Sequence, residues 1–130
     1  MKQFHCPQEP EPGIRLPLTT LTFGNISQIL TLLQHDPFES IERSIWISVK
    51  ELSSAALEEL CALIWIGRDN DEQDAWPSLV TEARGIDPWY VFEKISHPKY
   101  ITNGIQRLGL TEAFTRYVLC KEALRPGIAA

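Results

Sequence analysis

The fold of this chain is constrained most by one stretch, LSSAALEELCALIWIGR at residues 52–68. Apolar side chains recur there at the i, i+3, i+4, i+7 spacing of one helix face, at Leu57, Leu60, Cys61 and Ile64. Between Leu52 and Gly67 only Glu58 and Glu59 are charged, so a helix here is apolar around most of its circumference. Such a helix is normally covered on several sides. The sequence therefore predicts a central, buried helix.

The two ends of this predicted helix carry residues that favour helix initiation and helix termination. Ser53 or Ser54 can accept hydrogen bonds from the free amides of the first turn. Gly67 can adopt the left-handed conformation that closes a helix, which leaves Arg68 just past the negative end of the helix dipole. We expect the helix to end there.

Most of the remaining chain also shows helical spacing of its apolar side chains, interrupted by prolines and glycines. We expect further helices at residues 25–35, 77–84, 88–95, 98–108 and 111–124. Short helices joined by proline-marked turns favour an orthogonal bundle of five or six helices over a long coiled bundle. The 130 residues are enough for one core, so we expect a mainly α fold with a single helical domain over residues 14–130.

The N-terminal third is less regular. Residues 1–13 hold three prolines and a glycine, which predicts an extended N-terminal arm. Residues 16–23 (LPLTTLTF) are rich in β-branched and apolar side chains, and residues 44–50 (SIWISVK) alternate as a strand does. The two segments predict a small two-stranded sheet packed on the helices. The alternative is that residues 44–50 form an extended lead-in to the central helix.

Charge and hydropathy argue against several classes of partner. The chain has 12 Lys and Arg against 17 Asp and Glu, a net charge of −5, whereas nucleic-acid binding depends on clustered Lys and Arg. No apolar run approaches the roughly 20 residues that span a bilayer. The first residues also lack the apolar core of a signal peptide. We therefore expect no nucleic acid as main partner, no membrane contact, and a place in the cytoplasm of a bacterium or a virus-infected cell.

A four-residue motif gives the one family resemblance. Trp65, Ile66, Gly67 and Arg68 form a Trp-Ile-Gly-Arg sequence at the end of the central helix. Further matching positions follow at Trp76, Tyr90, Pro98, Gly104, Leu108 and Gly109. In these positions the segment from about Ile47 to Leu110 resembles an uncharacterised bacterial family, a domain of unknown function. It departs from the family pattern at Asp69, where a second glycine is expected. The resemblance implies a helical fold and no known activity.

The acidic loop at residues 69–74 invites comparison with a calcium-binding loop. Asp69 and Asp71 fit its first and third positions, but Asp74 replaces the glycine at position six and Val80 replaces the glutamate at position twelve. We therefore expect a solvated acidic loop. The sequence contains no Gly-rich phosphate loop, GxSxG or HExxH, and Cys61 lies on the apolar stripe. It predicts no catalytic residue, no cofactor and no metal ligand.

Arg68 is the residue for which the sequence best supports a functional role. With Trp65 and Trp76 on either side of it, Arg68 can stack on an indole while its planar fork binds a carboxylate. We favour an internal carboxylate, from Asp69, Asp71, Asp74 or a Glu of the C-terminal helix. The alternative is a carboxylate of a partner or an acidic ligand.

We expect a small, acidic, helical binding or regulatory protein that acts through protein–protein contacts, a homodimer included. The candidate partner-binding residues are Trp65, Arg68 and Trp76, since aromatic and arginine side chains dominate interface hot spots. We expect Trp46 and Trp89 to belong to the core. The alternative function is an enzyme or a small-ligand binder with a pocket near Arg68.

Overall fold

The chain folds into short helices. The computed structural model describes residues 9, 10, 12–34, 42–95 and 97–123. Their helices are α1 (Pro12–Arg15), α2 (Phe23–Leu33), α3 (Glu42–Lys50), α4 (Ser54–Asp69), α5 (Trp76–Glu82), α6 (Pro88–Lys94), α7 (Pro98–Arg107) and α8 (Thr111–Ala123), with a 3-10 helix, η2 (Gln73–Ala75), before α5. The mainly α prediction is confirmed, with eight α-helices in these residues instead of five or six. None of the helices described is long and apolar enough to cross a membrane.

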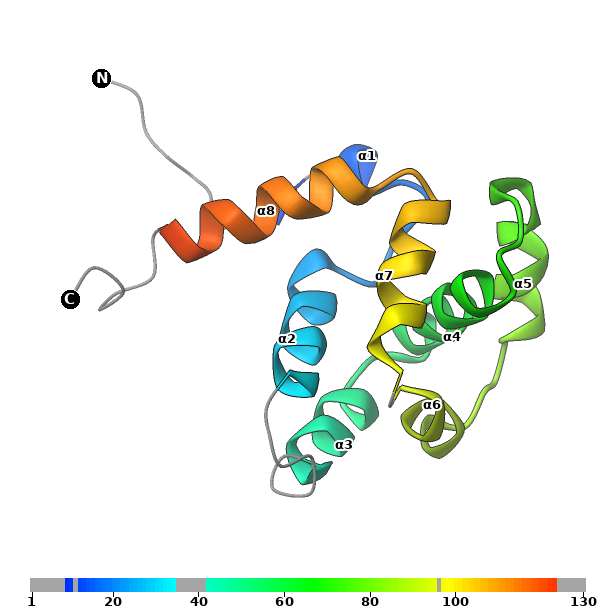
Figure 1. The fold of residues 1–130 in the computed structure, drawn as a ribbon. Helices are drawn as coiled ribbons and strands as arrows, with labels where there is room; N and C mark the ends of the chain where they lie inside the picture. Colours follow the sequence, from blue (N-terminus) through cyan, green and yellow to red (C-terminus); the bar gives the residue numbers. More distant parts are fainter. Residues whose placement is uncertain (1–8, 11, 35–41, 96, 124–130) are drawn as a thin grey trace.

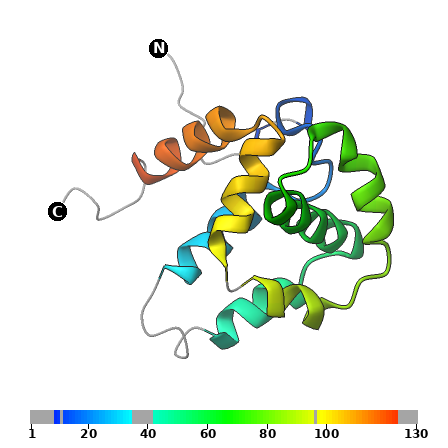
Figure 2. The same cartoon turned by 45° about the vertical axis from the view of Figure 1, so that its right-hand side comes forward.

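The predicted central helix, α4, lies in the middle of the molecule. Figures 1 and 2 show α7, α5 and α6 arranged around it. Its residues Leu60, Ala62, Leu63 and Ile66 have no exposed surface. The Ser53 hydroxyl accepts a hydrogen bond from the Ala56 amide at 3.1 Å, so the predicted serine cap is confirmed. The core of the protein is therefore built on α4.

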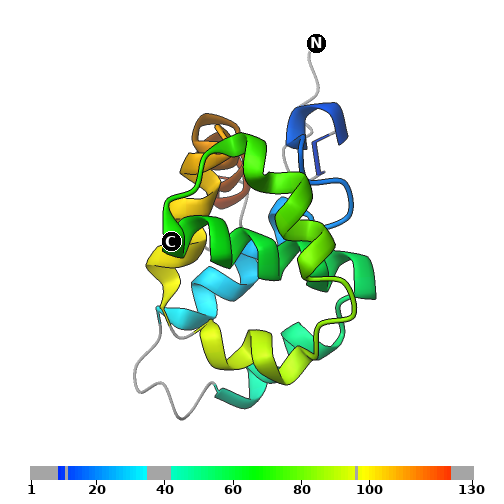
Figure 3. The same cartoon turned by 90° about the vertical axis from the view of Figure 1, so that its right-hand side faces the viewer.

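The C-terminal end of α4 differs from the prediction. The helix continues through Gly67 to Asp69, and it is Asn70 that takes the left-handed conformation, with φ of 57°. Gly67 is buried because α7 crosses α4 at this point (Figure 3). A Cβ atom on Gly67 would overlap the carbonyl oxygen of Tyr100 and lie 2.6 Å from the amide nitrogen of Gly104. Gly67 thus allows two helices to cross in close contact, and it does not terminate α4.

The predicted two-stranded sheet is wrong, because no strand occurs among the described residues. Residues 44–50 belong to the helix α3, in which Ile45 and Val49 are buried one turn apart. Ile47 completes the alternating pattern in the sequence, yet it is 39% exposed. The alternating pattern therefore does not reflect a strand. The buried side chains are the pair spaced i, i+4, as on one face of a helix.

Residues 19–21 wrap around one buried carboxylate of α4, that of Glu59. The amides of Thr19, Thr20 and Leu21 donate to it at 3.0, 3.0 and 2.8 Å, and the Thr19 hydroxyl donates at 2.6 Å. Because three successive amides point to one carboxylate, they cannot alternate between the two sides of a strand. The predicted strand at residues 16–23 is therefore replaced by a curled loop that ends where α2 begins at Phe23.

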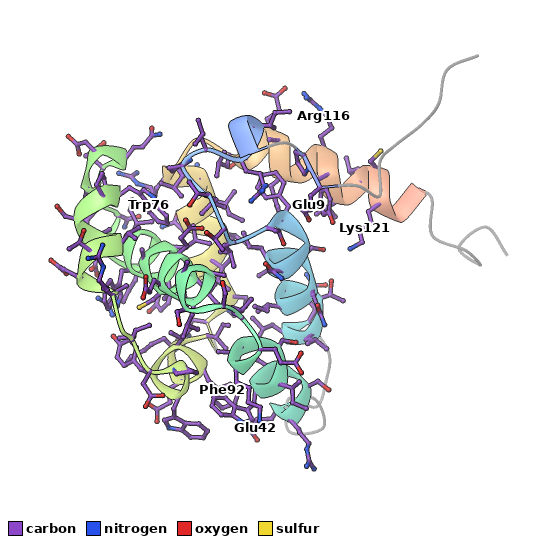
Figure 4. All side chains as sticks on the ribbon, turned by 180° about the vertical axis from the view of Figure 1, so that it is seen from behind. Glu9, Glu42, Trp76, Phe92, Arg116 and Lys121 are labelled. Carbon is purple, nitrogen blue, oxygen red and sulfur yellow. The ribbon has the colours of Figure 1, made fainter. Side chains whose placement is uncertain are left out.

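The helix α2 begins at Phe23, two residues before its expected start. A capping box causes this: the Thr22 hydroxyl accepts from the Asn25 amide at 3.0 Å, and the Asn25 side chain accepts from the Thr22 amide at 3.0 Å. Glu9 also accepts from the Phe23 amide, and Figure 4 shows it beside α8 at the start of α2. Of the expected arm at residues 1–13, residues 1–8 and 11 lie outside the described part.

We expect Glu59→Gln to lower the free energy of unfolding by about 2 kcal/mol, because hydrogen bonds to a charged acceptor are replaced and a glutamine N–H₂ group meets other donors. Urea unfolding followed by tryptophan fluorescence measures this. Glu58→Gln is the matched control, since the neighbouring Glu58 accepts one exposed bond from the Gly85 amide at 3.0 Å. Equal losses in the two variants would show that the Glu59 carboxylate does not hold the N-terminal segment.

Candidate functional site

Arg68 lies in the last turn of α4, and its side chain is 38% exposed. Its guanidinium binds the Asp69 carboxylate in a two-point fork, with Nε–Oδ1 at 2.9 Å and Nη2–Oδ2 at 3.1 Å. The hydrogen bond from Arg68 lowers the pKa of Asp69, and the same bond is the main reason that the pKa of Arg68 is raised. Of the internal partners considered for Arg68, the structure therefore selects Asp69. Exposed pairs of this kind contribute about 0–1 kcal/mol to stability.

Trp65 is the second predicted site residue, and it lies half-buried in the turn before Arg68. Its indole N–H donates to the Tyr90 hydroxyl at 3.1 Å, with the two rings edge to face at a centroid distance of 6.3 Å. The Tyr90 hydroxyl also helps to raise the pKa of Arg68. Lys94 of α6 lies over the Tyr90 ring at 5.2 Å. Tyr90 thus bonds to Trp65 and lies close enough to Arg68 to influence its pKa.

Trp76, the third predicted site residue, is only 6% exposed and belongs to the hydrophobic core at the start of α5. The structure does not place it on the surface beside Arg68. The two tryptophans expected in the core lie differently: Trp46 is half-buried and Trp89 is 49% exposed. The expectation for Trp89 is therefore wrong, because α6 turns that position towards solvent.

A groove of about 810 Å³ begins beside Arg68, where α7 crosses α4. The residues that line it are Gly67, Arg68, Asn70, Lys99, Tyr100, Thr102, Asn103, Gln106 and Thr111. Most of these side chains are polar. Arg68 and Lys99 are cationic, and none of the described residues that line the groove is Asp or Glu.

Asn103 fixes the floor of this groove. Its side-chain N–H₂ group donates to the Gly67 carbonyl oxygen at 2.6 Å and to the Asn70 side-chain oxygen at 2.7 Å. Both amide protons of Asn103 are therefore used to tie α7 to the end of α4. The side-chain oxygen of Asn103 and the ammonium of Lys99 remain to contact a ligand. Sequence reasoning missed both residues, although α7 repeats polar side chains at positions 99, 102, 103 and 106.

The acidic loop after α4 is held by Arg107 of α7. Its guanidinium donates to the backbone oxygens of Asp71 at 3.0 Å and Asn70 at 2.9 Å, and it lies 3.4 Å from the Glu72 carboxylate. In the part of the chain that the structure describes, no three His, Cys, Asp or Glu side chains gather where they could hold a metal ion. Arg107 therefore orders this loop from within the protein.

Cys61 faces the core from α4, as the sequence predicted, and is a free thiol. Burial raises the pKa of the Cys61 thiol to about 12, although the charge of Arg68 acts in the opposite direction. The thiol therefore stays protonated near neutral pH, and it lacks the thiolate that a nucleophile requires.

Comparison with known proteins gives the family of the chain. Residues 42–110 match the family model described as Protein of unknown function (DUF3775), which covers more than half of the sequence. The chain belongs to the DUF3775 family. Its DUF3775 region runs from the first residue of α3 to the residue before α8, so it contains α3–α7 and nearly the whole groove. The predicted membership of an uncharacterised family is confirmed. No curated protein and no solved structure matches the chain.

Proposed function

We propose that this protein is a non-catalytic binding or regulatory protein that holds an acidic segment of a protein partner in the groove between α4 and α7. A place in the cytoplasm of a bacterium or a virus-infected cell, expected from the sequence, is part of this proposal. The lining of the groove includes α7 residues from Lys99 to Gln106, so an extended segment can follow that helix.

The charge of the groove carries the proposal. The whole chain has a net charge of −5, yet α7 carries Lys99 and Arg107 and no Asp or Glu. Arg68 adds a second cation to the lining beside Lys99. Arg68 is already paired with Asp69, and Arg107 with Glu72, so Lys99 is the lining cation that no carboxylate of the described residues neutralises. An unpaired cation in the groove attracts an acidic partner.

Arg68 contributes to binding in a defined way. Its fork already holds Asp69, but that carboxylate is half-exposed and can share the guanidinium with a second acceptor. Trp65 and Tyr90 lie directly behind it, joined by their 3.1 Å hydrogen bond. Of the three residues predicted from the sequence, Arg68 lines the groove and Trp65 lies one turn before it on α4, whereas Trp76 lies in the core outside the groove.

A small anionic ligand is the second candidate for the same groove. Its volume of about 810 Å³ falls within the usual range of small-molecule pockets. Such pockets are mainly apolar and enclosing, whereas this groove is polar and open. The geometry therefore favours a protein segment over a small ligand.

The test uses a fluorescein-labelled hexaglutamate peptide, with binding followed by fluorescence anisotropy at low salt. We expect Lys99→Glu to weaken binding at least about tenfold, or about 1.4 kcal/mol. Arg68→Lys should also weaken binding, because it loses the planar fork, while the melting temperature stays nearly unchanged. Arg84→Glu is the control: it makes the same charge change on an exposed residue that does not line the groove.

Three outcomes of this experiment would contradict the proposal. Equal losses for Lys99→Glu and Arg84→Glu would mean that binding depends on net charge and not on the groove. Binding of free succinate or inorganic phosphate without binding of the peptide would support the small-ligand candidate. A hexalysine peptide that binds as tightly as hexaglutamate would remove the charge argument altogether.

A further inference from the structure

One side-chain amide at the floor of the groove has a fixed orientation. The Asn103 side-chain nitrogen lies 2.6 Å from the Gly67 carbonyl oxygen and 2.7 Å from the Asn70 side-chain oxygen. A carbonyl oxygen can only accept a hydrogen bond, so the end of the amide that faces Gly67 must be its N–H₂ group. The position of the Asn103 side-chain oxygen is therefore determined, because it lies at the other end of the same planar group.

This oxygen is an acceptor that the protein itself does not use. None of the described residues donates a hydrogen bond to it, whereas the N–H₂ group of the same side chain has two partners. Asn103 is half-buried and lines the groove. A side chain that is already held in place loses little conformational entropy when a ligand binds. The groove thus presents one acceptor that is ordered before a partner arrives.

A cation lies one helical turn away from this acceptor. Lys99 and Asn103 are spaced i, i+4 on α7, which places their Cβ atoms about 6 Å apart. The Lys99 ammonium only donates hydrogen bonds, and it forms no ion pair with a described residue. The two side chains therefore fit a ligand that carries an anionic group and an N–H donor close together.

Each acidic residue of a polypeptide carries both of these groups, a side-chain carboxylate and a backbone N–H. We propose, building on the proposed function, that the groove recognises the main chain of its acidic segment: the Asn103 oxygen accepts a hydrogen bond from a backbone N–H while Lys99 binds the neighbouring carboxylate. An anion without N–H groups, such as polyphosphate, leaves the Asn103 oxygen without a donor and brings its own oxygens towards it. Asn103 thus selects a peptide over other anions of equal charge.

Two fluorescein-labelled hexamers of equal charge test this inference by fluorescence anisotropy at low salt. One is hexaglutamate. The other is a peptoid hexamer of N-(2-carboxyethyl)glycine, which carries the same carboxylates on its backbone nitrogens and therefore has no backbone N–H. We expect the wild-type protein to bind hexaglutamate about fivefold more tightly than the peptoid, as the loss of one neutral hydrogen bond predicts.

The variant Asn103→Ala tests the residue itself, and it should remove the preference for hexaglutamate over the peptoid. The readout is the ratio of the two affinities, because a loosened groove floor would weaken both hexamers alike. Gln73→Ala is the matched control: it removes an amide from an exposed residue outside the groove and should keep the wild-type preference. Circular dichroism melts show that each variant is folded. If Asn103→Ala does not fold, the comparison of the two hexamers on the wild type still decides.

The outcomes separate this inference from the proposed function. If the wild type binds both hexamers equally tightly and Lys99→Glu weakens both, the groove recognises charge alone and the role given to Asn103 is wrong. An Asn103→Ala variant that is folded and still prefers hexaglutamate would overturn the inference as well. If hexaglutamate does not bind, or if Lys99→Glu leaves its binding unchanged, the proposed function fails and this inference fails with it.

Discussion

Gly67→Ala is expected to lower the free energy of unfolding by about 3 kcal/mol or more, at the upper end of the range for overpacked cores. The added Cβ would overlap the Tyr100 carbonyl oxygen and meet the Gly104 amide nitrogen at 2.6 Å. Both are backbone atoms of α7, which cannot move aside as a flexible side chain can. The variant therefore separates α7 from α4 or fails to fold. Urea unfolding with tryptophan fluorescence measures the loss.

The control for this substitution is Gly13→Ala. An added Cβ on Gly13 meets nothing within 4 Å, and Gly13 lies in the short helix α1. Alanine is favoured over glycine in helices, so stability should stay within about 0.5 kcal/mol of the wild type or rise slightly. If Gly67→Ala were as mild as Gly13→Ala, the two helices would not cross in direct backbone contact.

Leu60→Ala should cost about 2–5 kcal/mol, the usual range for a leucine in a filled core. Leu60 has no exposed surface and lies midway along α4, so its truncation leaves a cavity inside the bundle. The same urea experiment measures the loss, and Leu119→Ala, at a position 61% exposed, should change little. A loss below about half a kcal/mol for Leu60→Ala would place α4 at the surface.

Local sequence patterns predicted the second half of the fold well. The apolar circumference of residues 52–68 identified α4 as the central helix. Proline and glycine marked the later helices: Pro88 and Pro98 open α6 and α7, and Gly85 and Gly109 have positive φ values of 78° and 75° after α5 and α7. These signals work because they depend only on the backbone geometry of the residues themselves.

The N-terminal third could not be predicted in this way. Residues 19–21 curl because Glu59, about forty positions later, accepts their amide hydrogens. Ile45, Ile47 and Val49 alternate as in a strand, but the packing of α3 buries Ile45 and Val49 and leaves Ile47 exposed. In both cases the structure is decided by a distant part of the chain, about which a local pattern contains no information.

The candidate site could be predicted only in part, and the reason is the same. Arg68 and its internal partner Asp69 are neighbours in sequence, and so they could be found together. Lys99 and Asn103 come from α7, and only the α4–α7 crossing at Gly67 brings them to Arg68, while Tyr90 reaches it from α6. Spacing also placed Trp76 near Arg68, although α5 buries it in the core.

The binding role of the α4–α7 groove is tested most directly by nuclear magnetic resonance. Unlabelled hexaglutamate is titrated into the ¹⁵N-labelled wild-type protein, and the shift of each assigned backbone amide is followed. Binding in the groove predicts that the largest saturating changes occur at residues 67–70 and 99–106, on the two helices that form it. Changes that concentrate on α3 and α6, or no saturable change anywhere, would contradict it.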